Sequence, residues 1–483
     1  MLEAVGKKRS VSDELQGSKV TVIVDLIKQG IEKRHYLPGS KLPSIRKIAS
    51  LSSFSNFTVV EALEMLKAES YITSKPGKGF FVCESYGQHD LNVAPPVQYS
   101  DDIKQILLHE LVTSTEEFKP GCGFLPESWL PGEEVRQAFR AAFRQDNLNL
   151  SSYGSVYGSN LLRGQIRQRS INQGSLIKDN QIITCNSTLN AIDLLMRHLL
   201  IPGDKVIIDC PSYFNLKALA SYHKVEVVEF PRRGDSVNLE TFRELVDLHK
   251  PKIYLTSSVA HNPTGHSFSK EALYPLFSIL EEHNVHLVED GLYDELVDGK
   301  HYRMSAFFGF DNASYISGFS KLLTANTRTS YIISNQKLIE EIATIKRQTG
   351  GLTSDTTETA IYRILQTGAF DRHLRRLRSK LAMCKGQALQ WLQAQGFEPK
   401  VKNSSGLFLW VKSPVNPELF AEMALEKGII LAPGSMFSEH PEDQQCMRFN
   451  IPHTASQEIQ NALSLILTDI QNNSLNQYGL VTR

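Results

Sequence analysis

Four side chains of different chemistry follow one another between residues 290 and 328. They are an acid, a phenol, a lysine and an arginine: Asp290, Tyr293, Lys321 and Arg328. A lysine amine forms a Schiff base with an aldehyde, and an arginine binds a phosphate through two parallel hydrogen bonds. A carboxylate keeps a pyridine nitrogen protonated, and a phenol can hydrogen-bond a ring hydroxyl. Together they predict a site for an aldehyde cofactor that carries a phosphate and a pyridine ring.

Two apolar runs must position these residues. HLVED ends at Asp290, and YISGFSK ends at Lys321. Buried parallel strands have such continuous apolar runs, and open α/β sheets bind ligands at the carboxyl ends of their strands. Strand and helix patterns alternate over residues 120–360, which predicts an α/β fold with a mostly parallel sheet. The remainder, from about residue 373, predicts a smaller α+β subdomain.

The site residues resemble the pyridoxal 5′-phosphate (PLP) site of the fold-type I aminotransferases. The residues that match this family's motifs are Asn262 (in Asn-Pro-Thr-Gly), Asp290, Tyr293, Ser320, Lys321 and Arg328. The resemblance implies that Lys321 binds PLP, that Asp290 pairs with the ring nitrogen and that Asn262 hydrogen-bonds the ring hydroxyl. It also implies that Arg328 holds the phosphate.

The same resemblance assigns five further residues. Tyr213 falls where the family places an aromatic ring that stacks on the pyridine. Ser187 and Thr188 begin a helix after a strand, where backbone N–H groups favour an anion such as the cofactor phosphate. Tyr153 matches a tyrosine that reaches the phosphate of the partner subunit, which implies a homodimer. Arg448 matches the arginine that binds the substrate carboxylate.

Some residues near the predicted phosphate site depart from the family pattern. Asn186 replaces a usual glycine, Ala325 and Asn326 replace Pro-Gly, and Ser330 replaces a second glycine. Asparagine tolerates the left-handed backbone, so the first turn can still form. These departures are the main support for an alternative in which the domain dimerises without binding a cofactor.

The first 85 residues have a different pattern. Apolar residues at helical spacing run from Val20 to Ile31, and a Pro/Gly turn then ends at Ser44, which can cap a helix. Two more helical segments lead to YITSKPGKGFFV, two β-prone runs joined by a basic turn. This segment has 13 Lys and Arg against 9 Asp and Glu, a bias that favours phosphate contact. Three helices and a hairpin predict a winged helix-turn-helix.

This segment resembles the GntR family of bacterial DNA-binding domains. The matching text is LPGSKLPSIRKIA and TVVEALEMLKAESYITSKPGKGFFV. Carried over by position, the residues that would contact DNA are Ser44, Arg46, Ser55, Asn56 and Thr58, with Gly77, Lys78 and Gly79 at the wing tip. Asn56 stands where the family usually has arginine, which removes one base or phosphate contact. A helical module that contacts only protein is the alternative.

Composition sets few limits on function. The chain has 483 residues, and its 52 Lys and Arg balance 52 Asp and Glu, so overall charge indicates no partner. Six scattered cysteines without a C-x-x-C pair predict reduced thiols and no metal site. The N-terminus does not resemble a signal peptide, and no run is long enough to span a membrane. We therefore expect a cytoplasmic protein.

These patterns divide the chain into four parts. Residues 1–18 are expected to be a disordered tail, 19–84 a winged helix, 85–101 a Pro-containing linker, and 102–483 the aminotransferase-like domain.

This order resembles the MocR subfamily of bacterial transcription regulators over nearly the whole chain. The resemblance implies a head-to-tail homodimer that binds double-stranded operator DNA. It also implies that the protein senses PLP, or a small amino compound, through an aldimine at Lys321, with at most residual transaminase activity. Two alternatives remain open. One is an active aminotransferase with a fused DNA-binding head, and the other is a repressor whose C-terminal domain is cofactor-free.

Overall fold

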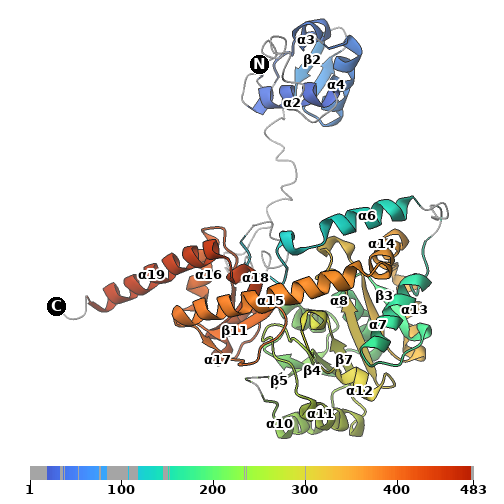
Figure 1. The fold of residues 1–483 in the computed structure, drawn as a ribbon, viewed down its shortest axis with the longest axis vertical. Coiled ribbons are helices and arrows are strands. Elements are labelled where there is room, and N and C mark those ends of the chain that lie inside the picture. The colour runs from blue at the N-terminus through green and yellow to red at the C-terminus, as the bar shows by residue number, and fades with distance from the viewer. Residues whose placement is uncertain are drawn as a thin grey trace. The chain divides into compact units, whose positions relative to one another are not determined.

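The computed structural model contains two compact units, residues 1–99 and 100–483 (Figure 1). The described residues are 19–32, 36, 39–52, 54–75, 78–83, 107, 118–144, 151, 153–232, 234, 236–299 and 301–479. The predicted tail (1–18), the predicted linker (85–101) and Gly77 lie outside them. Across the described residues, no helix is both long enough and apolar enough to cross a bilayer.

The described residues of the N-terminal unit form three helices and a β-hairpin. The helices are α2 (Lys19–Glu32), α3 (Ile45–Ser52) and α4 (Asn56–Ala68), and strands β1 (Ile72–Lys75) and β2 (Gly79–Val82) pair antiparallel. Each helix buries one apolar stripe, as spacings of three and four residues predict. The core of this unit includes Ile23, Ile27, Ile48, Val59, Leu63, Leu66, Ile72 and Val82. The arrangement is the winged helix-turn-helix predicted from the sequence.

A seven-stranded sheet forms the centre of the second unit, in the order β3-β9-β8-β7-β6-β4-β5. The strands are β3 (Ile182–Cys185), β4 (Lys205–Cys210), β5 (Glu226–Pro231), β6 (Ile253–Thr256), β7 (His286–Asp290), β8 (Ala313–Gly318) and β9 (Ser330–Ile333). Strands β4 to β8 run parallel, and β9 is antiparallel to both β3 and β8. The prediction of a mostly parallel sheet is therefore confirmed.

Helices cover both faces of this sheet (Figure 1). One face packs against α8 (Thr188–Leu199) and α13 (Gln336–Thr349). Part of the other face packs against α10 (Leu239–His249) and α11 (Lys270–Glu282). The further helices before the C-terminal segment are α6 (Gly132–Phe143), α7 (Asn160–Asn172), α9 (Phe214–Tyr222), α12 (Met304–Phe308), α14 (Asp355–Gln366) and α15 (Ala369–Ala394). This cover on both faces explains why most residues of the sheet strands are buried and why many of them are apolar.

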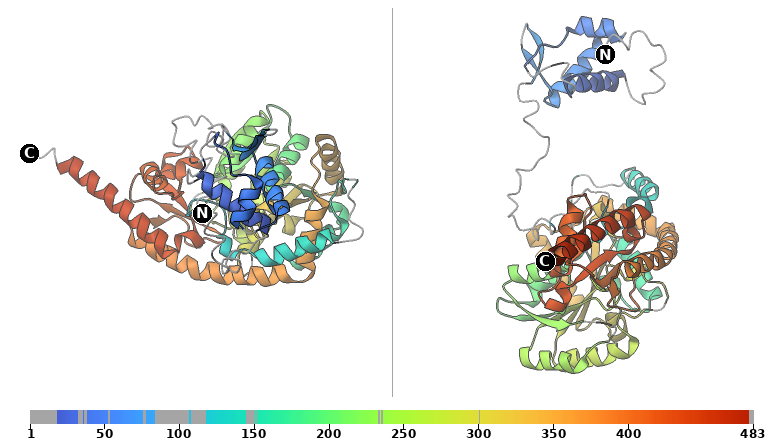
Figure 2. Two further views of the ribbon diagram at one scale, coloured as in Figure 1. Left: turned by 90° about the horizontal axis from the view of Figure 1, so that it is seen from above. Right: turned by 90° about the vertical axis from the view of Figure 1, so that its left-hand side faces the viewer.

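The C-terminal segment forms the predicted α+β subdomain (Figure 2). Its four strands pair antiparallel in the order β10-β11-β13-β12. They are β10 (Glu398–Pro399), β11 (Phe408–Lys412), β12 (Ala432–Pro433) and β13 (Cys446–Asn450), and the helices are α16 (Pro417–Leu425), α17 (Pro441–Gln444), α18 (Ile451–Thr454) and α19 (Gln457–Gly479). The apolar core of this subdomain is continuous with the packing of α14 and α15, so the subdomain and the sheet are joined.

Candidate functional site

A cavity of about 430 Å³ lies where the parallel strands of the seven-stranded sheet end. Eleven residues were assigned to the cofactor or its substrate from the sequence, and ten of them line this cavity. The ten are Ser187, Thr188, Tyr213, Asn262, Asp290, Tyr293, Ser320, Lys321, Arg328 and Arg448. Some of these residues are more than 200 positions apart in the sequence, and the fold brings them together around one cavity.

Asp290 ends β7 at the wall of this cavity. Its Oδ1 accepts a hydrogen bond of 3.0 Å from the backbone N–H of Leu292. Burial raises the pKa of Asp290 to about 6, and the charges of Asp294 and Glu289 act in the same direction. A protonated ring nitrogen beside Asp290 would favour its ionised form.

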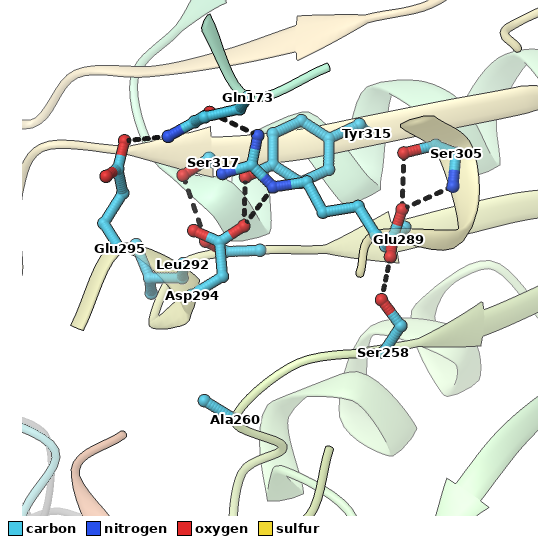
Figure 3. A network of polar contacts seen from close by, with 12 residues as sticks. Gln173, Ser258, Ala260, Glu289, Leu292, Asp294, Glu295, Ser305, Tyr315 and Ser317 are labelled. Carbon is cyan, nitrogen blue, oxygen red and sulfur yellow. Dashed lines mark hydrogen bonds and ion pairs between the residues drawn. The ribbon is translucent and has the colours of Figure 1, made fainter. Parts of the chain in front are cut away.

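Glu289 and Asp294, the acids on either side of Asp290, point into a separate buried network (Figure 3). Glu289 accepts hydrogen bonds from the Ser258 hydroxyl and from the backbone N–H and hydroxyl of Ser305. These contacts occupy both oxygens of the Glu289 carboxylate, which a buried acid requires.

Asp294 is neutralised by a buried arginine. Arg303 Nε donates to Asp294 Oδ2 at 2.6 Å, and the Tyr315 hydroxyl donates to the same oxygen at 2.6 Å (Figure 3). Arg303 is further held by Gln173, through a 2.6 Å hydrogen bond from its Nη1. Asp290 is thus the acid of this run that faces the cavity.

Lys321 follows β8 and lies against an aromatic ring. Its Nζ is 3.4 Å from the centroid of the Phe124 ring. Burial, together with the nearby charges of Arg448 and Arg328, lowers the pKa of Lys321 to about 7. A lysine with this pKa is largely uncharged just above neutral pH, which is the nucleophilic form of the amine.

The predicted phosphate end of the cavity combines a helix start with an arginine. Ser187 caps α8, because its hydroxyl accepts a 3.0 Å hydrogen bond from the Asn190 N–H. The Ser187 hydroxyl therefore serves the helix in this structure, and the α8 N-terminus faces the cavity beside Thr188 and Arg328. The N–H groups of a helix N-terminus and a guanidinium both attract phosphate.

The residues that depart from the family pattern are accommodated by a short turn. Ala325 and Asn326 form the 3₁₀ turn η4 (Ala325–Thr327), and Arg328 follows it with a φ of 43°. Asn326 and Ser330 line the cavity. The loop beside the predicted phosphate site is thus ordered without the family's glycines.

Arg448 links the C-terminal subdomain to the cavity. It lies on β13, and its Nη1 donates to Asn262 Oδ1 at 2.7 Å. Its Nη2 and Nε both donate to the backbone oxygen of Gly121, at 2.6 Å and 3.2 Å. The side chain of Arg448 is 2% exposed, so its charge is shielded from solvent and interacts with the cavity and with these acceptors.

Two tyrosines complete the cavity wall. The hydroxyl of Tyr213 accepts a 2.8 Å hydrogen bond from Asn215, and its ring packs on Phe214 with centroids 4.5 Å apart. The hydroxyl of Tyr293 donates to the backbone oxygen of Gly123 at 3.3 Å. Burial raises the pKa of both phenols, so both remain hydrogen-bond donors at neutral pH.

Tyr153 is the assigned residue that lies away from the cavity. Its side chain is 89% exposed, and it is not among the described residues that line the cavity of its own chain. The role in a partner subunit that the family resemblance implies stays a prediction.

Seven of the eight predicted DNA-contact residues lie in the described part of the winged helix: Ser44, Arg46, Ser55, Asn56, Thr58, Lys78 and Gly79. Six are exposed, and Thr58 is half-buried. Ser55 caps α4, since its hydroxyl accepts a 3.1 Å hydrogen bond from the Thr58 N–H. Gly79 has a φ of 100°, which side chains rarely adopt, at the point where the hairpin turns.

A model of the class I and II aminotransferases matches residues 126–466. This chain belongs to that family. A second model, the gntR family of bacterial regulatory proteins, matches residues 19–82 of the same chain. The aminotransferase-like unit is therefore joined in sequence to a DNA-binding unit, which is the architecture of the MocR subfamily.

Curated relatives match this chain across both of its units. The uncharacterized HTH-type transcriptional regulator YdcR of Escherichia coli (strain K12) is 26% identical over 443 residues, covering 89% of this chain and 94% of YdcR. The HTH-type transcriptional regulator NorG of Staphylococcus aureus (strain USA300) is 22% identical over 444 residues, covering 89% of this chain and 99% of NorG. The match extends across the whole regulator in each case.

Solved aminotransferases share the fold of the second unit. Kynurenine aminotransferase of Pyrococcus horikoshii, determined with PMP, superposes with a TM-score of 0.69 at 21% identity and covers 79% of this chain and 97% of its own. An archaeal alanine:glyoxylate aminotransferase superposes with a TM-score of 0.70 at 18% identity, covering 77% and 95%. The fold class predicted from the sequence is confirmed.

The cavity of this aminotransferase-like unit fits PLP by the chemistry of its donors. The buried carboxyl of Asp290 can pair with a protonated ring nitrogen. The amine of Lys321, whose pKa is lowered, can react with an aldehyde. Arg328 and the α8 N-terminus offer donors to a phosphate.

Some functional candidates escaped the sequence analysis. Gly123 and Phe124 line the cavity, and a Cβ added at Gly123 would lie 2.8 Å from the Tyr293 hydroxyl. The run of small residues before Phe124 could have indicated them, because small residues allow the backbone to approach a ligand closely.

In the winged helix, Phe57 is the second residue of α4 and is 78% exposed. It falls outside the apolar stripe of α4, and periodicity alone could have flagged it.

Proposed function

We propose that this protein is a PLP-dependent, DNA-binding transcription regulator that senses PLP or a small amino compound. One observation carries the proposal: ten assigned side chains converge on one cavity in a chain that also has a winged helix. The naming of YdcR and NorG as HTH-type transcriptional regulators supports it. A regulator that binds operator DNA would act in the cytoplasm of a bacterial cell.

Within the cavity, each side chain would hold a different part of the cofactor. Asp290 would bind the ring nitrogen, Asn262 and Tyr293 the ring hydroxyl, and Tyr213 the ring face. Ser320, Arg328 and the start of α8 would bind the phosphate. Bound PLP supplies a reactive carbonyl and an electron sink. Lys321 Nζ, kept uncharged by burial, would be the protein's nucleophile toward that carbonyl.

Arg448 would recognise the carboxylate of an amino-acid ligand. A carboxylate that binds both guanidinium N–H groups must compete with Asn262 Oδ1 and the Gly121 oxygen, which Arg448 now contacts. Because Arg448 lies on β13, this exchange would repack the edge between the C-terminal subdomain and the sheet. A ligand can shift a conformational equilibrium only if it makes different contacts in the two conformations.

In the winged helix, the start of α4 would enter the major groove and Lys78 would contact a backbone phosphate. Arg46, exposed on α3, would contact a second phosphate. The protein would act as a homodimer, which presents two such units to two half-sites.

The test is the visible absorption spectrum of the purified protein, recorded with PLP before and after addition of amino acids, together with operator affinity under the same conditions. We expect absorption of covalently bound cofactor, a spectral change with one class of amino compound, and a parallel change in DNA affinity. A protein that stays colourless with excess PLP would contradict the cofactor half of the proposal. A spectral change without any change in DNA affinity would contradict the sensing half.

An active aminotransferase is the second candidate, because the cavity contains both Lys321 and Arg448. Lys321 could also act as a proton-transfer base. With a second keto acid added to accept the amino group, release of keto acid from the amino compound in amounts that exceed the protein would support this candidate over the regulator.

A further inference from the structure

Three potential metal ligands meet beside the cofactor cavity although they are far apart in the sequence. They are Cys210 at the end of β4, Glu229 on β5 and His440, which precedes α17. One ligand atom from each lies within 4.8 Å of the other two. The sequence predicted no metal site, because cysteine spacing alone does not show which residues the fold brings together.

The register of the sheet explains the first two ligands. Glu229 is paired with Ile208 in the parallel ladder between β4 and β5. Side chains alternate along a strand, so Cys210, two residues after Ile208, points to the same face as Glu229. His440 comes from the C-terminal subdomain, and its Nε2 is 2.9 Å from Glu229 Oε2.

We propose that Cys210, Glu229 and His440 form a binding site for a divalent metal ion of the zinc class. Thiolate, imidazole and carboxylate are the ligands that zinc takes in proteins, at about 2.0–2.3 Å. Three protein ligands leave a fourth position of the tetrahedron to water. His440 is half-exposed and provides an entry path, whereas Cys210 lies at the buried end of the site.

The contacts around the three ligands resemble the outer partners that orient metal ligands. Lys217 Nζ contacts Glu229 Oε1, which leaves Oε2 on the side of His440. The Ser438 hydroxyl is 3.3 Å from Cys210 Sγ and donates to Asp443 at 2.8 Å. Hydrogen bonds of this kind fix ligand orientation in known metal sites.

The charges around the site determine its expected affinity for a metal ion. The ammonium group of Lys217 opposes a second cation, whereas the carboxylate of Glu229 and a thiolate at Cys210 attract it. A thiol binds a metal ion as the thiolate, so binding at Cys210 displaces a proton. The Lys217 ammonium beside Glu229 should make zinc binding weaker than at a site without a neighbouring cation.

The bound ion would tie the sheet to the C-terminal subdomain next to the cofactor cavity. Cys210 lies three residues before Tyr213, which lines the cavity, and the intervening Ser212 N–H donates to the Phe437 oxygen at 3.1 Å. The inference depends on these contacts alone and would stand if the proposed regulatory function failed.

The first experiment is calorimetric titration of the full-length, PLP-loaded protein with zinc chloride under reducing conditions. We expect one equivalent per chain. Cys210→Ser and His440→Ala should each weaken binding at least about tenfold, the lower range for lost contacts around a metal. Cys384→Ser removes another thiol, and Glu226→Gln removes a neighbouring acid on β5; both should bind zinc like the unchanged protein.

Cobalt(II) identifies the ligands directly. A four-coordinate site should give visible ligand-field bands, together with a sulfur-to-cobalt charge-transfer band that Cys210→Ser loses. Retained cofactor absorbance shows that each variant is folded, and if Cys210→Ser does not fold, Glu229→Gln and His440→Ala carry the test. Absence of stoichiometric zinc binding, or binding that survives both Cys210→Ser and His440→Ala, overturns the site and leaves an ion-pair network of Lys217, Glu229 and His440.

Discussion

At the residue scale, the burial of Lys321 leads to a pH prediction. Its pKa of about 7 means that the free amine fraction, and hence the rate of covalent PLP attachment, should rise through pH 7 and level off above about pH 8. Absorbance of bound cofactor after mixing apoprotein with PLP measures this rate, and Lys321→Ala should show no attachment. A lysine with an ordinary pKa would instead give a rate that keeps rising about tenfold per pH unit to pH 9.

Arg46 and Phe57 should affect DNA binding in different ways. Arg46 is exposed on α3 and is expected to bind a phosphate, so Arg46→Ala should weaken binding to all sequences. It should also reduce the slope of log affinity against log salt by about one. Titrations of labelled operator at several salt concentrations give this slope, and the exposed Arg243 of α10 is a matched control. An unchanged slope would remove Arg46 from the interface.

Phe57 should contribute base preference rather than general affinity. Its exposed ring at the start of α4 is placed to contact a thymine methyl group in the major groove. Phe57→Ala should therefore flatten the sequence preference at one base pair of each half-site, at a cost of about 1–3 kcal/mol in discrimination. Selection from random DNA identifies that base pair. Replacing its thymine by uracil should weaken the unchanged protein and leave Phe57→Ala unaffected.

At the scale of elements, Ser55 has two tasks that substitution can separate. Its hydroxyl caps α4, and Ser55→Ala should destabilise that helix by about 1 kcal/mol. Ser55→Asp should keep the cap while placing a negative charge against DNA, so stability should persist and DNA affinity should fall. Amide hydrogen exchange in α4 measures the first effect and operator titration the second. Equal exchange in both variants would show that the cap contributes nothing.

The elements also show how far the sequence could predict this site. Asp290, Lys321 and Asn262 each follow an apolar run, and parallel strands that end at one edge must bring such residues together. The partners of Arg448 could not be predicted, because Asn262 and Gly121 reach it only through the packing of the C-terminal subdomain on the sheet. The meeting of Glu229 with His440 depends on the same long-range packing.

At the scale of the whole molecule, the exposure of Tyr153 predicts that the cofactor site is shared between two chains. Its ring is 89% exposed and away from the cavity of its own chain. If it reaches the phosphate of the partner's cofactor, Tyr153→Phe should weaken PLP binding about five- to tenfold, as expected for one lost hydrogen bond of about 1 kcal/mol. Tyr222, which is 85% exposed on α9, provides the control through Tyr222→Phe.

A mixed dimer tests this sharing directly. A chain with Tyr153→Phe keeps its lysine, and a chain with Lys321→Ala keeps its tyrosine, so their heterodimer combines both groups in one of its two sites. Coexpressed chains with different affinity tags allow the heterodimer to be isolated, and absorbance titration with PLP measures its sites. We expect one covalent site per heterodimer with the affinity of the unchanged protein. If that site instead binds as weakly as the Tyr153→Phe homodimer, the tyrosine acts within its own chain, and the shared-site dimer is wrong.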